Sequence, residues 1–251
     1  MDVLGVRVSA TTMDRAVAEL GRWVDAGERS YVCVTGVHGV MESQDDPDLV
    51  EIHNRSGLTT TDGMPLVWAA KYAGVEPVER VYGPDLMLAV LERSVDEGWG
   101  HFLYGGGDGV AETLADELRS RFPGVRIVGT HTPPFRPLTA EEEDAVVAEI
   151  DGSGADFVWV GLSTPKQERW MAAMRPRLSA AGLLGVGAAF DMHSGTVRQA
   201  PRWMQRSGLE WLFRLIVEPR RLWRRYLSNN PRFVAKVLRR RPRAVDPVSL
   251  R

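Results

Sequence analysis

The sequence predicts an α/β protein built on a mainly parallel sheet with helices on both faces. Short β-branched or apolar runs alternate with amphipathic helical patterns, which is typical of βαβ units. Glycines and polar residues gather directly after five of these runs, at the carboxyl ends where ligands bind in open parallel sheets. Strand-like runs stop after about Gly195, and an Arg- and Trp-rich helical segment follows. We therefore expect an α/β domain over residues 1–195 and a basic helical appendage over residues 196–251.

Six runs are the candidate strands: Val3–Val8, Tyr31–Thr35, His101–Tyr104, Arg126–Gly129, Phe157–Val160 and Leu183–Val186. Helices are expected to begin near Thr12, Pro47, Met64, Pro84, Asp108, Ala140 and Pro165. Proline suits a first helical turn because its missing N–H costs nothing there. Thr139 and Glu142 have the spacing of a capping box, which marks the start of the helix after Thr139.

The charge of the chain is unevenly distributed. The 251 residues are 44% hydrophobic and 25% charged with a net charge of -2, an ordinary globular composition. The segment from Arg198 to Arg243, however, holds fourteen Arg and Lys against two acids, so the rest of the chain is acidic. Trp203, Trp211, Trp223 and Tyr226 stand among these arginines, a mixture that suits an anionic membrane surface.

Two other interpretations of the basic segment remain open. Basic and aromatic sequence also suits nucleic acid, although the acidic remainder of the chain argues against it, and we expect no nucleic-acid partner. Alternatively, the segment is a helix packed on the body by its Leu and Trp face. Cys33 is the single cysteine of the sequence, so an internal disulfide is excluded. We find no signal peptide and no membrane span. These observations indicate a cytoplasmic protein that is soluble or peripheral.

Two loops are candidate phosphate sites. Gly105, Gly106 and Gly107 follow a strand and open a helix, where backbone N–H groups can approach a phosphate. A tight βα turn explains the same glycines equally well. The second loop runs from Gly161 to Glu168, and Lys166 is locally unfavourable at a helix N-terminus unless an anion binds there. This favours a ligand at Gly161, Pro165, Lys166, Gln167 and Glu168.

Asp62 ends the run Thr59–Thr61 and is followed by Gly63. A carboxylate there can take the proton from an attacking hydroxyl, although from spacing alone an Asp-Gly turn explains it better. Asp191 follows an apolar run and could accept hydrogen bonds from ribose hydroxyls. His38 and Glu42 are four apart on an expected helix, but the sequence shows no third ligand, so we expect no metal and no other cofactor.

A set of motifs stands in one order along almost the whole chain: Asp62-Gly63, Glu79-Arg80-Val81 with Gly83 and Asp85-Leu86, Gly106-Gly107, Gly161 through Glu168, Gly185-Val186-Gly187 with Phe190-Asp191 and Gly195, Arg198 with Ala200-Pro201, and Gly208 through Leu227. From Thr35 to about Phe233 the chain thereby resembles the WecG/TagA/CpsF glycosyltransferases. The resemblance implies an inverting, metal-independent enzyme of Rossmann-like fold. It implies a UDP-sugar donor and an undecaprenyl-diphosphate-linked acceptor, in the synthesis of teichoic acid linkage units, enterobacterial common antigen or exopolysaccharide.

The resemblance also implies roles for single residues. Asp62 is the base, while Thr35, Arg80 and Gln167 line the site. The C-terminal appendage reaches the inner face of the membrane, and we expect Arg214, Arg221 and Arg224 to meet the acceptor diphosphate, because arginine forks match phosphate oxygens. Dimers or higher assemblies are expected as well.

One departure concerns the sugar. Many members carry T-x-N after the second strand, whereas this chain has Thr35-Gly36-Val37 followed by His38 and, four residues on, Glu42. This favours an exopolysaccharide-type donor over N-acetylmannosamine. The alternative enzyme class, a nucleotide-dependent epimerase or oxidoreductase, requires a full G-x-G-x-x-G after the first strand, and Ser9-Ala10-Thr11-Thr12 stands there instead. A non-catalytic membrane-surface adaptor is the third alternative.

Overall fold

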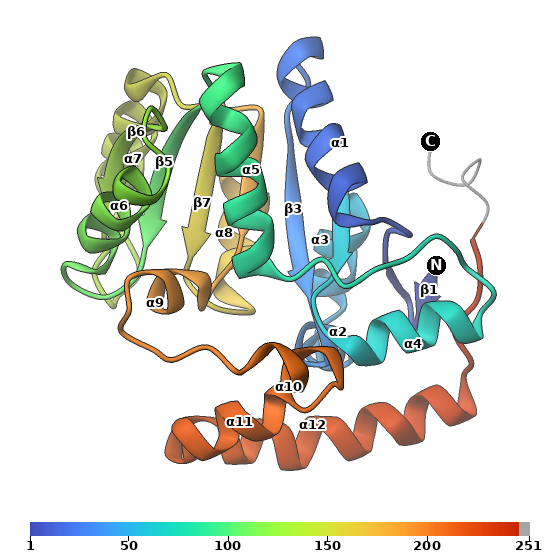
Figure 1. The fold of residues 1–251 in the computed structure, drawn as a ribbon. Helices are drawn as coiled ribbons and strands as arrows, with labels where there is room; N and C mark the ends of the chain where they lie inside the picture. Colours follow the sequence, from blue (N-terminus) through green and yellow to red (C-terminus); the bar gives the residue numbers. More distant parts are fainter. Residues whose placement is uncertain (246–251) are drawn as a thin grey trace. The chain divides into compact units, whose positions relative to one another are not determined.

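A computed structural model describes residues 1–245 (Figure 1), and these residues form two compact units. Unit 1 contains Met1–Met13, Val34–Tyr82 and the described residues from Arg198 onward. Unit 2 contains Asp14–Cys33 and Gly83–Val197. The C-terminal segment from Arg198 onward is thus grouped with two earlier segments of the chain.

The main sheet is the α/β sheet that the sequence predicts. It has six strands in the order β4-β3-β8-β7-β5-β6, and the pairs from β3 to β6 are parallel. The strands are β3 (Ser30–Thr35), β4 (Leu58–Thr61), β5 (Gly100–Gly105), β6 (Arg126–His131), β7 (Phe157–Gly161) and β8 (Gly182–Gly185). Five of the six candidate strands are therefore confirmed, and β4 is the strand that Asp62 follows.

The sixth candidate strand, Val3–Val8, is wrong. The chain reverses at Leu4 (φ 57°) and Gly5 (φ 95°), so β1 (Asp2–Val3) and β2 (Val6–Arg7) form a small antiparallel hairpin outside the main sheet. Glycine adopts a left-handed conformation without steric cost, which permits this reversal inside a β-branched run. The alternation of apolar residues here reflects which side chains are buried, and it does not show that the segment belongs to the main sheet.

Unit 2 holds β5 to β8, most of β3, and the helices that pack on them. Helix α6 lies against β5 and β6, α8 lies against β7 and β8, and α9 contacts α5 and α6 (Figure 1). The capping box is confirmed: Glu142 N donates to Thr139 Oγ1 at 3.3 Å, and Thr139 N donates to Glu142 Oε2 at 2.8 Å. The helices assigned to this unit are α1 (Met13–Ala26), α5 (Gly83–Glu97), α6 (Val110–Arg121), α7 (Ala140–Ser153), α8 (Lys166–Met174) and α9 (Ala189–His193).

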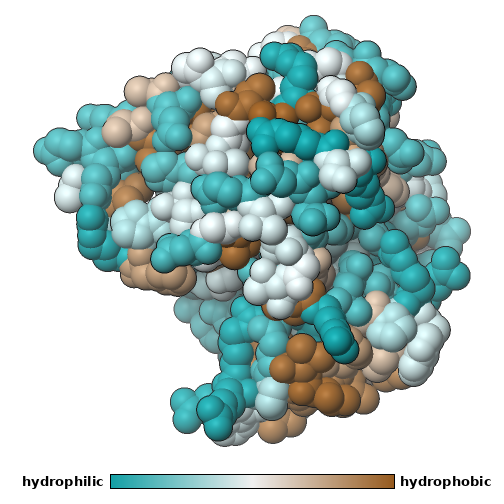
Figure 2. Space-filling view, turned by 60° about the vertical axis from the view of Figure 1, so that its left-hand side comes forward, coloured by the Kyte–Doolittle hydropathy of each residue, from teal (hydrophilic) through white to brown (hydrophobic). Residues whose placement is uncertain are grey.

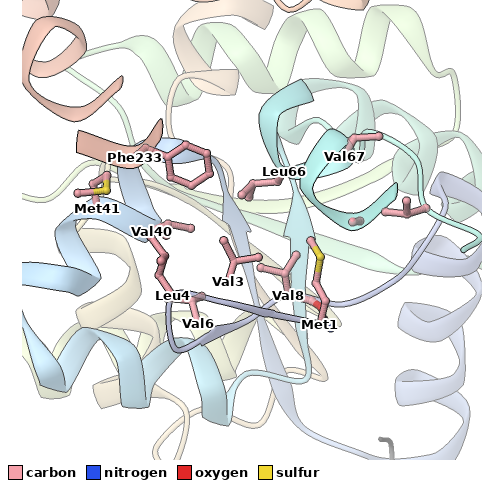
Figure 3. Close-up of a cluster of buried hydrophobic side chains, with 12 residues drawn as sticks. Met1, Val3, Leu4, Val6, Val8, Val40, Met41, Leu66, Val67 and Phe233 are labelled. Carbon is pink, nitrogen blue, oxygen red and sulfur yellow. Dashed lines mark hydrogen bonds between the residues drawn. The ribbon is translucent and has the colours of Figure 1, made fainter. Parts of the chain in front are cut away.

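Unit 1 is built on the hairpin and on helices from the middle and the end of the chain. These helices are α2 (Val37–Asp45), α3 (Pro47–Arg55), α4 (Met64–Tyr72), α10 (Arg202–Arg206), α11 (Glu210–Val217) and α12 (Pro219–Arg239). Its core joins Val3 and Val8 of the N-terminus to Val40, Leu66 and Phe233 (Figure 3). Because Phe233 of α12 is part of this core, the basic C-terminal segment is integrated into unit 1 and is not a separate tail.

Candidate functional site

In unit 1 the Asp62 turn is held through its main chain. Asp62 follows the last residue of β4, and its N–H donates to the carbonyl of Thr35 at 2.9 Å. On the other side Arg80 Nε donates to the Asp62 carbonyl at 2.6 Å. A Cβ on Gly36 would be in ordinary contact with Asp62 Oδ2, at 3.6 Å, so the carboxylate lies beside the residue that follows β3. Thr35 and Arg80, both expected in the site, thus fix the backbone on which the carboxylate stands.

The hydroxyl of Thr35 forms a hydrogen bond inside unit 1. Thr35 is buried, and its Oγ1 lies 2.9 Å from His53 Nε2. The other ring nitrogen, His53 Nδ1, lies 2.8 Å from the carbonyl of Leu49, which can only accept, so Nδ1 carries a proton. In the neutral ring Nε2 is then an acceptor, and the Thr35 hydroxyl donates to it. Sequence reasoning placed Thr35 in the site but missed the buried His53 behind it.

The three arginines selected from the C-terminal sequence have different surroundings in the structure. Arg214 lies 3.7 Å and Arg221 lies 2.6 Å from Glu218 Oε2, so the two arginines share one carboxylate. Arg224 is exposed, with its guanidinium 5.2 Å from the centre of the Trp223 ring. All three residues were expected near the acceptor, and the structure places Arg214 inward and the other two on the surface.

Arg225 of α12 was not among the arginines expected from the sequence, and the charge of Asp62 acts on it. Burial lowers the pKa of Arg225 to about 10, while the nearby charges of Tyr226 and Asp62 act in the opposite direction. The Nε atoms of Arg214 and Arg225 are both buried without a hydrogen-bond partner among the described residues. A periodic signal was available, because the buried residues Leu222, Asn229 and Phe233 mark the inward face of α12 and Arg225 lies on it.

Two further residues connect the C-terminal helices to earlier segments of unit 1. Glu210 of α11 accepts from Arg80 Nη2, and Tyr82 donates to Glu210 Oε1 at 2.7 Å. Asn229 Nδ2 donates to His38 Nδ1 at 3.0 Å, and the same His38 atom lies 3.4 Å from Glu42 Oε1. The pair His38 and Glu42, noted for its spacing, therefore shares one helix face with a contact to α12.

In unit 2 the glycines of the expected phosphate loops are required by packing. Gly105 has φ 123°, and a Cβ there would lie 2.8 Å from the carbonyl carbon and oxygen of Gly161. A Cβ on Gly161 would lie 2.7 Å from the Phe190 ring. Gly106 N also donates to the Gly161 carbonyl at 3.1 Å. The ends of β5 and β7 thus approach so closely that these two positions need glycine whether or not a ligand binds.

The start of α8 buries two acceptor atoms that have no partner. Gln167 Nε2 donates to the carbonyl of Gly185 and to Glu168 Oε1, each at 3.2 Å, and Thr164 donates to Glu168 Oε1 at 2.8 Å. Because the Gly185 carbonyl can only accept, the amide nitrogen of Gln167 is assigned on that side. Gln167 Oε1 and Glu168 Oε2 remain buried without a partner among the described residues. Buried acceptors normally find donors, so this loop is suited to a ligand that donates hydrogen bonds.

The remaining expected contacts in unit 2 are at the surface or half-buried. Lys166 is exposed in the first turn of α8, and Pro165 precedes that helix as its N-cap residue. Gly107 is half-buried beside Gly106. Asp191 lies half-buried in α9, where its carbonyl accepts from Val197 N at 2.9 Å. The structure therefore brings Gly105, Gly161, Gln167 and Glu168 together more tightly than Lys166 or Asp191.

The C-terminal helices expose an apolar stripe beside arginines. On α12, Trp223, Leu227, Val234 and Leu238 are exposed at helical spacing, opposite the buried face. Figure 2 shows a brown, hydrophobic patch among hydrophilic residues at the bottom of the view. No helix within residues 1–245 is both long and apolar enough to cross a bilayer. In the same residues no group of three or more His, Cys, Asp or Glu is placed to hold a metal ion.

One comparison with known proteins bears on these residues. Residues 1–246 of the chain match the sequence model of a group described as the glycosyl transferase WecG/TagA/CpsF family. The match includes Asp62, Arg80, Gln167 and the C-terminal helices, and so it extends over the candidate residues of both units.

Proposed function

The chain belongs to the WecG/TagA/CpsF family of glycosyltransferases, and from this premise we propose that it transfers a sugar from a UDP-sugar to an undecaprenyl-diphosphate-linked acceptor with inversion. The product is part of a cell-surface glycan. The observation that carries the proposal is the Asp62 carboxylate, which stands on a backbone fixed by Thr35 and Arg80. Its negative charge acts on the guanidinium of Arg225.

In the proposed reaction Asp62 is the general base. Its carboxylate takes the proton of an acceptor hydroxyl while that oxygen bonds to the anomeric carbon of the donor. The bond between the anomeric carbon and the β-phosphate oxygen breaks, and UDP leaves with the electron pair. One displacement of this kind inverts the anomeric centre. The remaining proton stays on Asp62 until solvent takes it, so the step needs no oxidant, reductant or covalent intermediate.

The glycine loops and the start of α8 are proposed to bind the donor. Backbone N–H groups at Gly105, Gly106 and Gly107 suit the diphosphate. The unpartnered acceptors Gln167 Oε1 and Glu168 Oε2 suit donor groups, and a UDP-sugar has both hydroxyls and an imide N–H. We also keep Gly161, Pro165, Lys166 and Asp191 in the donor site. In this proposal the side-chain acceptors bind the nucleoside or the sugar, and the backbone N–H groups bind the phosphates.

The acceptor is proposed to come from an anionic membrane surface. A polyprenyl chain stays in the bilayer, so the enzyme must bind at the headgroup plane. The exposed stripe of α12 supplies apolar contact, and exposed arginines next to it each contribute about 1 kcal/mol near anionic lipid. Arg214 and Arg225 are half-buried and are proposed to meet the acceptor diphosphate, with Arg221 and Arg224 nearer the surface.

The proposal includes no metal. Arginine side chains are proposed to meet the charge of the diphosphates, a role that divalent ions take in many transferases. Activity should therefore persist in excess EDTA, and a complete loss that manganese restores would contradict this part. The donor sugar is proposed to be a hexose of exopolysaccharide type, with N-acetylmannosamine as the second candidate, because His38 and Asn229 occupy the region after β3.

The test is a panel of UDP-sugars with a short-chain polyprenyl-diphosphate-sugar as acceptor, with product detected by mass spectrometry. We expect turnover with at least one donor and inversion at its anomeric carbon by NMR. Titrations with UDP and with NAD separate this proposal from a Rossmann-type epimerase or oxidoreductase. Binding of NAD without UDP would favour that alternative, and binding of neither, with vesicle binding retained, would favour an adaptor.

A further inference from the structure

Glu210 of α11 is a largely buried carboxylate that forms hydrogen bonds with residues of the segment after β4. Its side chain is 13% exposed, and the Arg80 side chain with which it forms an ion pair is 14% exposed. One oxygen of Glu210 accepts from Arg80 Nη2, and the other accepts from the Tyr82 hydroxyl at 2.7 Å. Both carboxylate oxygens are thus used within unit 1, by residues 128 and 130 positions earlier in the chain.

These contacts fix the guanidinium group of Arg80 in three directions. Its Nε donates to the carbonyl of Asp62, its Nη2 contacts Glu210, and its Cζ lies 3.9 Å from the centre of the Tyr82 ring. A guanidinium is planar and only donates, so an acceptor on one edge, a second acceptor on another edge and a ring on its face leave it one orientation. Removing the carboxylate would free Nη2 and loosen the Tyr82 ring beneath it.

The electrostatics support a fixed arrangement. Burial raises the pKa of Tyr82 well above its usual range, and the charges of Glu210 and Asp62 raise it further, so the hydroxyl stays a donor to Glu210. A buried carboxylate is stable only when it is paired and hydrogen-bonded, and Arg80 with Tyr82 meets that requirement. The same pairing prevents Arg80 from turning away from Asp62.

We propose that Glu210 is a positioning residue that holds Arg80 on the Asp62 carbonyl and thereby fixes the Asp62 carboxylate. The inference rests on the proposed function, because it gives α11 a role in the transfer step. Glu210 does not touch substrate in this assignment. It sets the geometry of the base, and a displacement of about 1 Å at a reacting group can lower turnover about 100-fold.

The first experiment compares Glu210→Gln with the wild type. Glutamine keeps the shape and one acceptor but cannot pair ionically with Arg80. We expect kcat to fall about 10- to 100-fold, with KM for the UDP-sugar changed less than about threefold. The matched control is Asp45→Asn, which breaks the bidentate ion pair of Asp45 with Arg232 between α2 and α12. The control should leave both constants within about twofold.

A double-mutant cycle shows whether Glu210 acts through Arg80. In an Arg80→Ala background the Glu210→Gln change should have little further effect on kcat, because the residue that Glu210 positions is already absent. Additive effects of the two changes would overturn the proposal. So would a Glu210→Gln variant that loses thermal stability while its kcat at a lower temperature equals that of the wild type.

A readout without turnover keeps the proposal separate from the proposed function. In ¹⁵N-labelled protein the Arg80 Nε–H, identified by its loss in Arg80→Ala, should exchange slowly with water because it donates to the Asp62 carbonyl. Glu210→Gln should speed that exchange at least tenfold, whereas Asp45→Asn should not. If no UDP-sugar is turned over, the transferase proposal fails, but this exchange rate still decides whether Glu210 holds Arg80. Unchanged exchange in Glu210→Gln would refute the positioning role.

Discussion

The two units carry different kinds of groups at their strand ends. In unit 1 the region around Asp62 is rich in ionisable side chains, including Arg80, Glu210, Arg214 and Arg225. In unit 2 the ends of β5 and β7 carry glycines whose main chains touch, and the start of α8 carries the buried pair Gln167 and Glu168. The first region is held together by interactions between charged side chains, and the second is shaped by main chains that approach each other closely.

This difference explains why the two regions are visible to different degrees in the sequence. Close approach is a local requirement, so it leaves local glycines that can be found by inspection. Buried charges must be paired, and their partners come from wherever the fold brings them. The Asp62 region accordingly draws on β4, on the segment of Arg80 and Tyr82, and on α11 and α12. Four experiments would break or sharpen the contrast.

The largest effect is expected at Asp62. Asp62→Asn should lower turnover about 10²- to 10⁴-fold, the usual contribution of a general base, while UDP affinity changes less than about threefold. The contacts to Thr35 and Arg80 use the backbone of Asp62, so asparagine should leave them intact. Steady-state kinetics and UDP titration measure the two quantities. Turnover close to that of the wild type would show that Asp62 of unit 1 is not the general base.

The second effect is expected at Gly105, on the other side of the comparison. Gly105→Ala places a Cβ 2.8 Å from the Gly161 backbone at φ 123°, so it should cost at least about 2 kcal/mol of stability and weaken UDP binding at least tenfold. Gly152→Ala in α7 is the control, because nothing lies within 4 Å of its added Cβ. Urea unfolding and UDP titration test both variants. Unimpaired UDP binding in a folded Gly105→Ala protein would show that this turn does not bind the donor.

The third effect concerns pH and the core of unit 2. Burial lowers the pKa of His101 to about 3, from 6.5 in the unfolded chain. Between these values the unfolded state binds the proton and the folded state does not, so stability falls as the pH decreases below about 6.5. From pH 8 to pH 5 the loss should be about 2 kcal/mol. His101→Gln keeps an acceptor for Trp159 Nε1. Over the same pH range its free energy of unfolding, measured with urea, should fall by about 2 kcal/mol less than that of the wild type. Equal losses in both proteins would show that His101 does not cause the pH dependence.

The smallest effect separates membrane binding from the charged region of unit 1. Leu227→Glu combined with Leu238→Glu should weaken binding to anionic vesicles about tenfold, since both leucines are exposed on α12 and glutamate is repelled by the lipid. Phe135→Glu is the control, an exposed apolar residue of unit 2 that is 92% exposed. Arg225→Gln should instead lower activity more than vesicle binding. Vesicle sedimentation that is equal for all variants would exclude α12 as the membrane contact.

Truncating the chain before Arg198 would not be a clean alternative to these substitutions. Phe233 and Leu222 of α12 are buried, and Phe233 packs in the same cluster as Val3 and Val8 (Figure 3). Removing the helix would expose that core and leave the loss of activity without a specific cause. The surface leucines test the membrane contact while the inward face of α12 stays in place.

Much of the architecture could be predicted from local patterns. The helix starts at Pro47, Met64 and Ala140 were predicted at the residues where the structure begins them, because proline and capping preferences act within one turn. The exception was Val3–Val8, where two positive φ angles at Leu4 and Gly5 convert an expected strand into a hairpin. A β-branched run gives no warning of such a reversal other than the single glycine.

For the candidate site, the sequence by itself determined the strand-end positions of Asp62, Gly105 and Gly161, and it determined the family, since motif order is a property of the chain. Only the tertiary structure decided which side chains stand behind them. His53 behind Thr35, Glu210 behind Arg80, and Arg225 in the electrostatic field of Asp62 have no local signature that identifies their partners. The physical reason is that a buried polar group is stabilised by any correctly placed partner, and the fold, rather than the spacing along the chain, places it.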